Sequence, residues 1–129
     1  MNRVGNRSGV PILRWFLVVL WLGFIFYLSS KPLTDYPPIA PDYVAHLFEY
    51  SVLAALLWRA LQNTAKTSLS LSLLVIIFTS AYGFADELHQ LFVPSRTFSL
   101  IDLSVDTLAA ILIALINGVF YPRAKKQRL

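Results

Sequence analysis

Four apolar segments, separated by short polar connections, constrain this chain more than any other feature of its sequence. They cover about residues 12–29, 42–61, 69–92 and 99–121. An α-helix needs about 20 mainly apolar residues to cross a hydrocarbon core of roughly 30 Å. Of all residues, 57% are hydrophobic and only 14% are charged, whereas soluble domains carry about 25% charged residues. The sequence therefore predicts an all-α integral membrane bundle of four transmembrane helices in a single domain, residues 1–129.

Prolines mark several limits of these segments. The connection at residues 31–41 contains four prolines and cannot continue a helix, and Pro94 and Pro122 are expected to end the third and fourth segments. The first segment is longer than the apolar region of a signal peptide, which spans about 7–15 residues, and it lacks a small-residue cleavage site. We therefore interpret it as a retained span.

The second segment is the least apolar of the four. It reaches the length of a span only if it begins at Asp42, and His46 and Glu49 then lie within the membrane. The prediction that this segment crosses the bilayer is therefore also a prediction that ionisable groups are buried there.

The distribution of lysine and arginine predicts the orientation of the bundle. Four spans place both termini on one side, where nine basic residues gather: Arg3, Arg7, Arg14, Arg59, Lys66, Arg123, Lys125, Lys126 and Arg128. The opposite side carries Lys31 and Arg96. Because basic residues favour the cytoplasmic side, we expect cytoplasmic termini in a multi-pass membrane protein. The net charge of +4 is then a topology signal, and we expect no nucleic-acid partner.

All seven acidic residues and both histidines fall toward the opposite, outward end of the segments. Three polar stripes follow helical spacing there: Asp42, His46, Glu49 and Tyr50 in the second segment, Tyr82, Asp86, His89 and Gln90 in the third, and Asp102 and Asp106 in the fourth. On this spacing Glu87 is rotated off the third stripe. Ionisable groups in a membrane are costly and usually mark function. The predicted outward-facing pocket gathers Asp42, His46, Glu49, Tyr50, Asp86, Glu87, His89, Gln90, Arg96, Asp102 and Asp106.

Structural roles compete with a ligand role at some of these positions. Asp42 and Asp102 lie in first helical turns, where a carboxylate interacts favourably with the helix dipole and can cap the helix. Arg96 is placed to neutralise an acidic neighbour, namely Asp86, Glu87 or Asp102. The joint occurrence of polar residues on three segments, all at one level, favours a shared pocket.

Two kinds of chemistry fit these residue types. His46 with Glu49, and Asp86 with His89, have the i, i+3 spacing that can hold a divalent metal in a helical bundle. Such spacings arise often by chance, so we assign no metal and no cofactor. Arg96 can instead bind an anionic or amphiphilic head group through charge-assisted hydrogen bonds. The absence of cysteine excludes disulfides, thiolate metal sites and cysteine nucleophiles.

One run of residues is specific enough to indicate a family. Asp86-Glu87-x-His89-Gln90-x-Phe92-Val93-Pro94-x-Arg96 follows Ser29-Ser30 and Asp42…His46…Glu49-Tyr50, and Asp102 comes after it. In this order the chain resembles, over nearly its whole length, the VanZ-like family of small bacterial membrane proteins, named for a teicoplanin-resistance protein. The resemblance implies a membrane location and a link to glycopeptide antibiotics or the cell envelope, without a defined reaction. The family's site residues carry over most directly to these positions of the chain: His46, Tyr50, Asp86, Glu87, His89, Gln90, Arg96 and Asp102.

The chain also departs from the family pattern. Tyr43 stands where family members commonly have lysine, and Ser95 where they commonly have glycine. Asp106, and Ala109 or Ala110, stand where they usually carry asparagine and glycine. The missing lysine and the additional aspartate make the predicted pocket more acidic.

The leading functional prediction is a non-enzymatic membrane protein with an outward-facing polar pocket. In the lipid bilayer, this pocket would bind an envelope lipid head group or a glycopeptide antibiotic. The alternatives are a membrane-embedded hydrolase that uses the histidine and carboxylate set, and a small proton-coupled transporter with His46 and Glu49 as a relay. The oligomeric state stays open.

Overall fold

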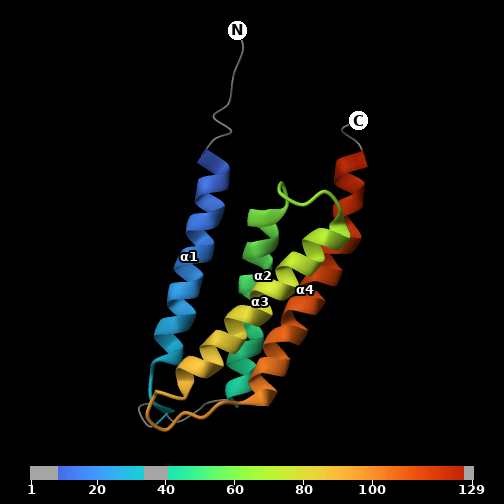
Figure 1. The fold of residues 1–129 in the computed structure, drawn as a ribbon. Helices are drawn as coiled ribbons and strands as arrows, with labels where there is room; N and C mark the ends of the chain where they lie inside the picture. Colours follow the sequence, from blue (N-terminus) through green and yellow to red (C-terminus); the bar gives the residue numbers. More distant parts are fainter. Residues whose placement is uncertain (1–8, 34–40, 127–129) are drawn as a thin grey trace.

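The computed structural model describes residues 9–33 and 41–126, with side chains up to residue 120. The fold is all-helical, with α1 at Gly9–Ser29, α2 at Asp42–Leu61, α3 at Ser68–Gln90 and α4 at Leu100–Lys126 (Figure 1). All four helices are long and apolar enough to cross a membrane, which confirms the four predicted spans and implies a bilayer setting. Arg3, Arg7 and Arg128, which contribute to the predicted orientation, lie outside the described residues.

Two helix ends differ from the predicted bounds, and each lies near a proline. α1 begins at Gly9 and includes Pro11, because a proline in a first turn lacks only an N–H group that has no partner within the helix. α4 continues through Pro122 to Lys126, so the prediction that Pro122 ends it is wrong. A proline near a helix end disturbs one turn, and the residues after it can keep helical dihedral angles.

The second helix is the centre of the bundle. Among the described residues, α2 and α3 each contact all three other helices, whereas α1 and α4 share no contact and lie at opposite edges in Figure 1. In the most apolar part of α2, 39% of residues are buried, compared with 11% in α1. This position explains how α2, the least apolar helix, can cross a membrane, because the neighbouring helices shield its polar stripe from lipid.

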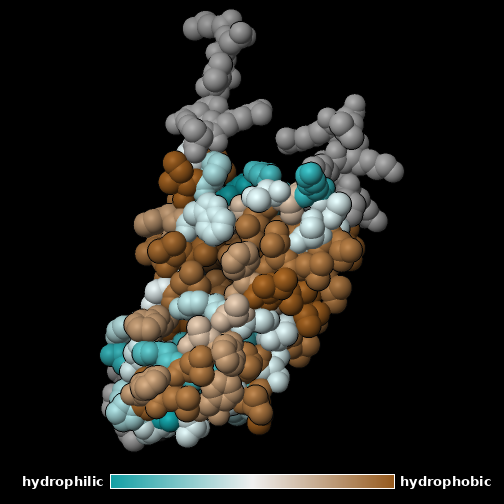
Figure 2. Space-filling model, viewed as in Figure 1, coloured by the Kyte–Doolittle hydropathy of each residue, from teal (hydrophilic) through white to brown (hydrophobic). Residues whose placement is uncertain are grey.

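The apolar core follows α2 along its length. It contains Tyr50, Leu53, Ala54, Leu57, Trp58 and Leu61 of α2, Leu71 and Val75 of α3, Ala109, Ala110 and Ala114 of α4, and Val18 and Ile25 of α1. The contribution of α4 consists of alanines, and small residues allow transmembrane helices to approach closely. The outer surface remains apolar, and in Figure 2 brown side chains dominate the middle of the visible face.

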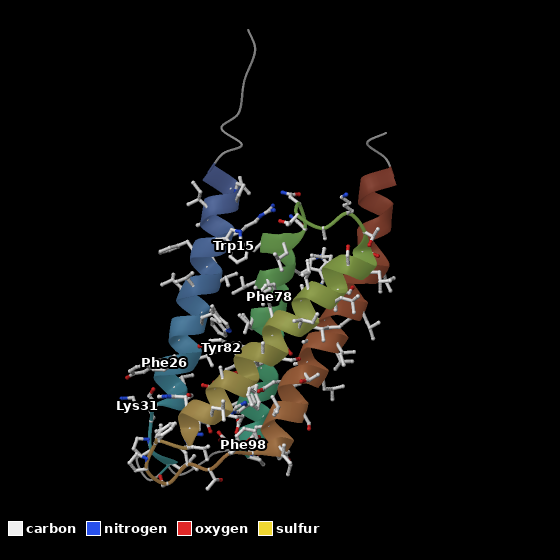
Figure 3. All side chains as sticks on the ribbon, viewed as in Figure 1. Trp15, Phe26, Lys31, Phe78, Tyr82 and Phe98 are labelled. Carbon is white, nitrogen blue, oxygen red and sulfur yellow. The ribbon has the colours of Figure 1, made fainter. Side chains whose placement is uncertain are left out.

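Two side-chain hydrogen bonds attach the middle of α1 to the rest of the bundle. Trp21 Nε1–H donates to the carbonyl of Glu49 at 2.8 Å, and the Tyr82 hydroxyl donates to the carbonyl of Leu22 at 2.7 Å. Figure 3 shows Tyr82 between α3 and α1. The first turn of α1 and the last turn of α4 lie at the same end, and the α3–α4 connection lies at the other (Figure 1). Most of the candidate polar residues lie at this second end.

Candidate functional site

A buried histidine joins three helices. His46 of α2 is 3% exposed, and its Nδ1 lies 2.9 Å from Asp106 Oδ1 of α4. Its Nε2 lies 3.9 Å from Glu87 Oε1 of α3. The ring of Tyr50 stacks on the imidazole with 5.7 Å between centroids and 6° between planes. These contacts bring together the stripes predicted on the second and fourth segments.

Glu87 lies within this cluster, although helical spacing rotates it off the third stripe. Its side chain is fully buried, and its Oε2 accepts a hydrogen bond from the backbone N–H of Ser99 at 2.6 Å. The physical reason is that α3 packs against α2 and α4 at once. Its buried face is therefore wider than one stripe and includes both Asp86 and Glu87.

Gly83 gives Asp106 the space that it occupies. A Cβ atom at Gly83 would lie 2.6 Å from Asp106 Oδ2, closer than any ordinary contact. Asp106 is fully buried, and Oδ2 has no hydrogen-bond partner. Sequence reasoning missed Gly83, although a glycine one helical turn before the acidic run is a usable signal.

Asp86 and Gln90 form a second buried pair on α3. Gln90 Nε2 donates to Asp86 Oδ2 at 3.3 Å, one helical turn away. Asp86 is 4% exposed and Gln90 is 2% exposed. The predicted inward orientation of both side chains is therefore confirmed.

Arg96 links the α3–α4 connection to the first turn of α2 and to the segment that follows α1. Its Nη1 lies 2.7 Å from Asp42 Oδ2, and its Nε donates to the carbonyl of Lys31 at 3.1 Å. The predicted neutralisation of Asp86, Glu87 or Asp102 is replaced by this pair with Asp42. The hydrogen bond described for the Asp42 carboxylate goes to Arg96 and does not cap α2, but Asp42 does lie in the first turn, where the helix dipole favours a carboxylate.

Asp102 does not cap α4 either, because another residue performs that role. The backbone N–H of Asp102 donates to the Ser99 hydroxyl at 3.1 Å. Asp102 itself is buried, with 7% exposure. Its carboxylate therefore remains within the polar end of the bundle.

The turn before Arg96 has an unusual backbone. Ser95 has a φ of 63°, in the left-handed region that favours glycine. Glycine is also the residue that the family resemblance leads one to expect here. The Ser95 hydroxyl accepts a hydrogen bond from the backbone N–H of Leu33 at 3.1 Å, which links this turn to the segment after α1.

The second histidine lies in a different environment. His89 Nε2 is 3.0 Å from the hydroxyl of Ser30, and the imidazole lies 4.6 Å from the Phe26 ring, measured between centroids. Phe26, labelled in Figure 3, lies in the last turn of α1, and Ser30 directly follows that helix. His89 therefore contacts α1, whereas His46 contacts Asp106 and Glu87.

A cavity of about 360 Å³ opens beside the buried cluster. Its lining consists of Tyr27, Leu28, Ser29, Lys31, Pro32, Leu33, Asp42, Ala45, His46, Glu49, Gln90 and Arg96. Five of the predicted pocket residues are among them. Sequence reasoning missed Lys31, which lies at the end of α1 (Figure 3) with its Nζ 4.5 Å from the centre of the Tyr27 ring.

Two groups of side chains have donor atoms close enough to share a cation. Within the described ranges, one is His46, Glu87 and Asp106, all buried, and the other is Asp42, His46 and Asp102. In each group, one ligand atom per residue lies within 4.8 Å of the others. Neither contains Glu49, Asp86 or His89, so the i, i+3 pairs considered from the sequence are not the ones that gather.

Comparison with known proteins identifies the family. The VanZ/LLP1 family model matches residues 43–121, which include His46, the Asp86–Arg96 run and Asp106. No curated protein and no solved structure matches the chain. The matched region covers more than half of the chain, in agreement with the resemblance seen in its motifs. The chain therefore belongs to the VanZ/LLP1 family of proteins.

Proposed function

We propose that this protein binds the polar head group of an envelope lipid in the cavity between the ends of α1 and α2. In this proposal the protein catalyses no reaction, and its ligand-bound form acts in the cell envelope, including tolerance of glycopeptide antibiotics. One observation carries the proposal. The cavity has cationic side chains, Lys31 and Arg96, and anionic ones, Asp42 and Glu49, on walls that are otherwise largely apolar.

The charges match the chemistry of a lipid head group. A guanidinium has five N–H donors, and the contacts of Arg96 with Asp42 and the Lys31 carbonyl use Nη1 and Nε. The remaining donors, with the Lys31 ammonium, suit a phosphate. Glu49 lines the same cavity and offers a carboxylate to an amine or a hydroxyl. Leu28 and Leu33 supply apolar wall for the glycerol and the first acyl carbons.

The size of the cavity favours a head group over a whole antibiotic. A volume of about 360 Å³ lies near the low end of the range for pockets that bind small ligands, about 300–1,000 Å³. A glycopeptide with its sugars is much larger than such ligands. Antibiotic tolerance would then follow from the binding of an envelope lipid at the outer leaflet.

The proposed orientation has cytoplasmic termini and an outward-facing cavity in a bacterial cytoplasmic membrane. Arg14, Arg59 and Lys66 support it, because they lie at the end opposite Lys31 and Arg96. The chain has no cysteine, so single cysteines at exposed Asn63 and Phe92 can be tested with a membrane-impermeant thiol reagent. We expect labelling of intact cells at residue 92 alone, and labelling at residue 63 alone would reverse the orientation.

A membrane-embedded hydrolase is the second candidate. It is favoured by the hydrogen bond between Asp106 and His46, since an oriented imidazole beside a cavity is a typical general base. In this alternative, turnover of a lipid ester by the purified protein would depend on His46. A protein that binds lipid without turnover supports the head-group proposal instead.

The test of the proposed function is teicoplanin susceptibility in a Gram-positive host that lacks its own relatives of this protein. Four strains are compared at matched membrane levels: empty vector, wild type, Arg96→Gln and Arg59→Gln. Arg59 is the control because it is an exposed arginine at the opposite end of the bundle. We expect wild type and Arg59→Gln to protect the host, and Arg96→Gln to protect it much less.

The same proteins are then purified in mild detergent, and bound lipids are identified by native mass spectrometry. Wild type and Arg59→Gln should retain a phospholipid that Arg96→Gln loses. Equal retention by Arg96→Gln and wild type, or no protection by wild type, would contradict the proposed function.

A further inference from the structure

We propose that His46, Glu87 and Asp106 form a binding site for a divalent transition-metal ion. These three side chains come from α2, α3 and α4, so a bound ion would join the three helices inside the bundle. The inference goes beyond the head-group proposal, because the ion would lie in the buried cluster and not among the charges of the cavity.

The spacing of the donor atoms fits one ion. Zinc–nitrogen and zinc–oxygen bonds are about 2.0–2.2 Å long, so two ligands of one ion lie at most about 4.2 Å apart. His46 Nδ1 and Asp106 Oδ1 are separated by 2.9 Å, within that limit. One oxygen of Glu87 belongs to the same group, all of whose ligand atoms lie within 4.8 Å of one another.

Two carboxylate oxygens of these residues have no hydrogen-bond partner. Glu87 Oε1 and Asp106 Oδ2 are buried and make no hydrogen bond, and both side chains are fully buried. Buried carboxylate oxygens are nearly always paired, and an unpaired one indicates a missing partner such as an ion. Here the unpaired oxygens belong to the two residues that flank His46.

The neighbouring contacts hold the ligands in position. Asp106 Oδ1 and His46 Nδ1 lie 2.9 Å apart, so one ion can bind both atoms in place of the proton between them. The backbone N–H of Ser99 fixes the other oxygen of Glu87 at 2.6 Å. The ring of Tyr50 stacks on the imidazole. The arrangement therefore has the supporting contacts that metal sites need.

The charge at this end of the bundle favours a cation. The described residues place six acidic side chains there, Asp42, Glu49, Asp86, Glu87, Asp102 and Asp106, and all but Asp42 are buried. The described permanent cations at this end are Lys31 and Arg96, and Arg96 pairs with Asp42. Uncompensated charge is costly away from water. A divalent ion would neutralise the carboxylates of Glu87 and Asp106.

The donor set indicates which ions to test. One imidazole nitrogen with carboxylate oxygens suits Zn²⁺ and Mn²⁺, whereas ions that prefer thiolates have no ligand in a chain without cysteine. The full-length protein in detergent is stripped with a chelator, equilibrated with Zn²⁺ or Mn²⁺, and freed of unbound ion by gel filtration. Its metal content is then measured by mass spectrometry.

We expect wild type to retain one ion per chain with at least one of the two metals. Glu87→Gln should weaken binding by more than about 10-fold, since loss of a supporting contact alone typically costs about 10–100-fold. Glu49→Gln is the matched control, because Glu49 lies one turn from His46 but outside the donor group, and it should retain the ion. Circular dichroism and elution volume confirm that each variant is folded, and Asp106→Asn replaces Glu87→Gln if the latter is not.

The proposal is overturned if wild type retains neither metal, as expected if the buried carboxylates are protonated instead. It is also overturned if folded Glu87→Gln, or its replacement, retains the ion as wild type does. The metal test measures metal content in protein without added lipid, whereas the head-group test measures lipid retention by Arg96→Gln. Either proposal can therefore fail while the other stands.

Discussion

His46 Nδ1 lies 2.9 Å from Asp106 Oδ1, which directly joins α2 to α4 between residues 60 positions apart. Both side chains are buried, with exposures of 3% and 0%. Hydrogen bonds between transmembrane helices contribute about 0.6–2 kcal/mol each. An unpaired polar group in the same place would cost more, so this contact restricts how the two helices can pack.

Asparagine and leucine at residue 106 should therefore have different effects. Asp106→Asn keeps an oxygen that can accept from the His46 N–H, so we expect a change in unfolding free energy below about 1 kcal/mol. Asp106→Leu leaves the buried N–H without an acceptor and should destabilise by about 1–3 kcal/mol. Unfolding in mixed detergent micelles measures both values.

The control for added apolar volume on α4 is Ser104→Leu at an exposed position, which should be close to neutral. Equal destabilisation by asparagine and leucine at residue 106 would show that the negative charge, and not the hydrogen bond, determines the effect.

The pair between Arg96 and Asp42 should contribute little energy but hold the α3–α4 connection in place. The Arg96 side chain is 11% exposed and that of Asp42 is 36% exposed, so solvent screens the attraction. We expect a coupling free energy of about 1 kcal/mol or less in a double-mutant cycle of Arg96→Gln and Asp42→Asn. Arg96→Gln alone should cost more than Asp42→Asn, because it also loses the bond to the Lys31 carbonyl. Similar costs for the two single variants would contradict this structural role.

Much of the fold could be predicted from the sequence, because hydrophobic segment length is a local property. All four helices were predicted, and α2 has the expected bounds of Asp42–Leu61. Helical spacing also correctly placed His46, Asp86 and Asp106 toward the interior. Burial in a membrane requires polar groups to face protein, which makes such stripes informative.

The partners of these residues could not be predicted, because they depend on how the helices cross. Helical spacing alone places Glu87 and Asp86 on different faces of α3. Both side chains are nevertheless buried, because α3 packs against α2 as well as α4. His89 shares the predicted stripe, but the end of α1 lies there, and Phe26 and the adjoining Ser30 are its contacts. The pairing of Arg96 depends on the left-handed backbone of Ser95, a conformation that serine rarely adopts.

The left-handed backbone at Ser95 leads to a third prediction. A residue with a Cβ atom costs roughly 1–2 kcal/mol in this region relative to glycine. Ser95→Gly removes that cost but also the hydrogen bond from Leu33 N–H, worth about 1 kcal/mol, so the two changes nearly cancel. Ser95→Ala keeps the cost and loses the bond, and it should be about 1 kcal/mol less stable than wild type. Equal stability of Ser95→Ala and wild type would contradict a contribution from the hydroxyl.

Two glycines in the membrane-spanning helices should respond in opposite directions to replacement by alanine. At Gly83 the new Cβ would lie 2.6 Å from Asp106 Oδ2 and 3.1 Å from its Cβ, and Asp106 has little freedom to move because it bonds His46. Overpacking of this kind typically costs about 1–3 kcal/mol, so Gly83→Ala should lower the unfolding free energy in mixed micelles. At Gly118 the new Cβ would meet Ser72 Oγ at 3.7 Å, an ordinary contact, and alanine should stabilise the helix by about 0.5–1 kcal/mol. If Gly83→Ala is as stable as Gly118→Ala, Asp106 does not lie as close to α3 as described. The position of Asp106 as a ligand in the proposed metal site would then be wrong as well.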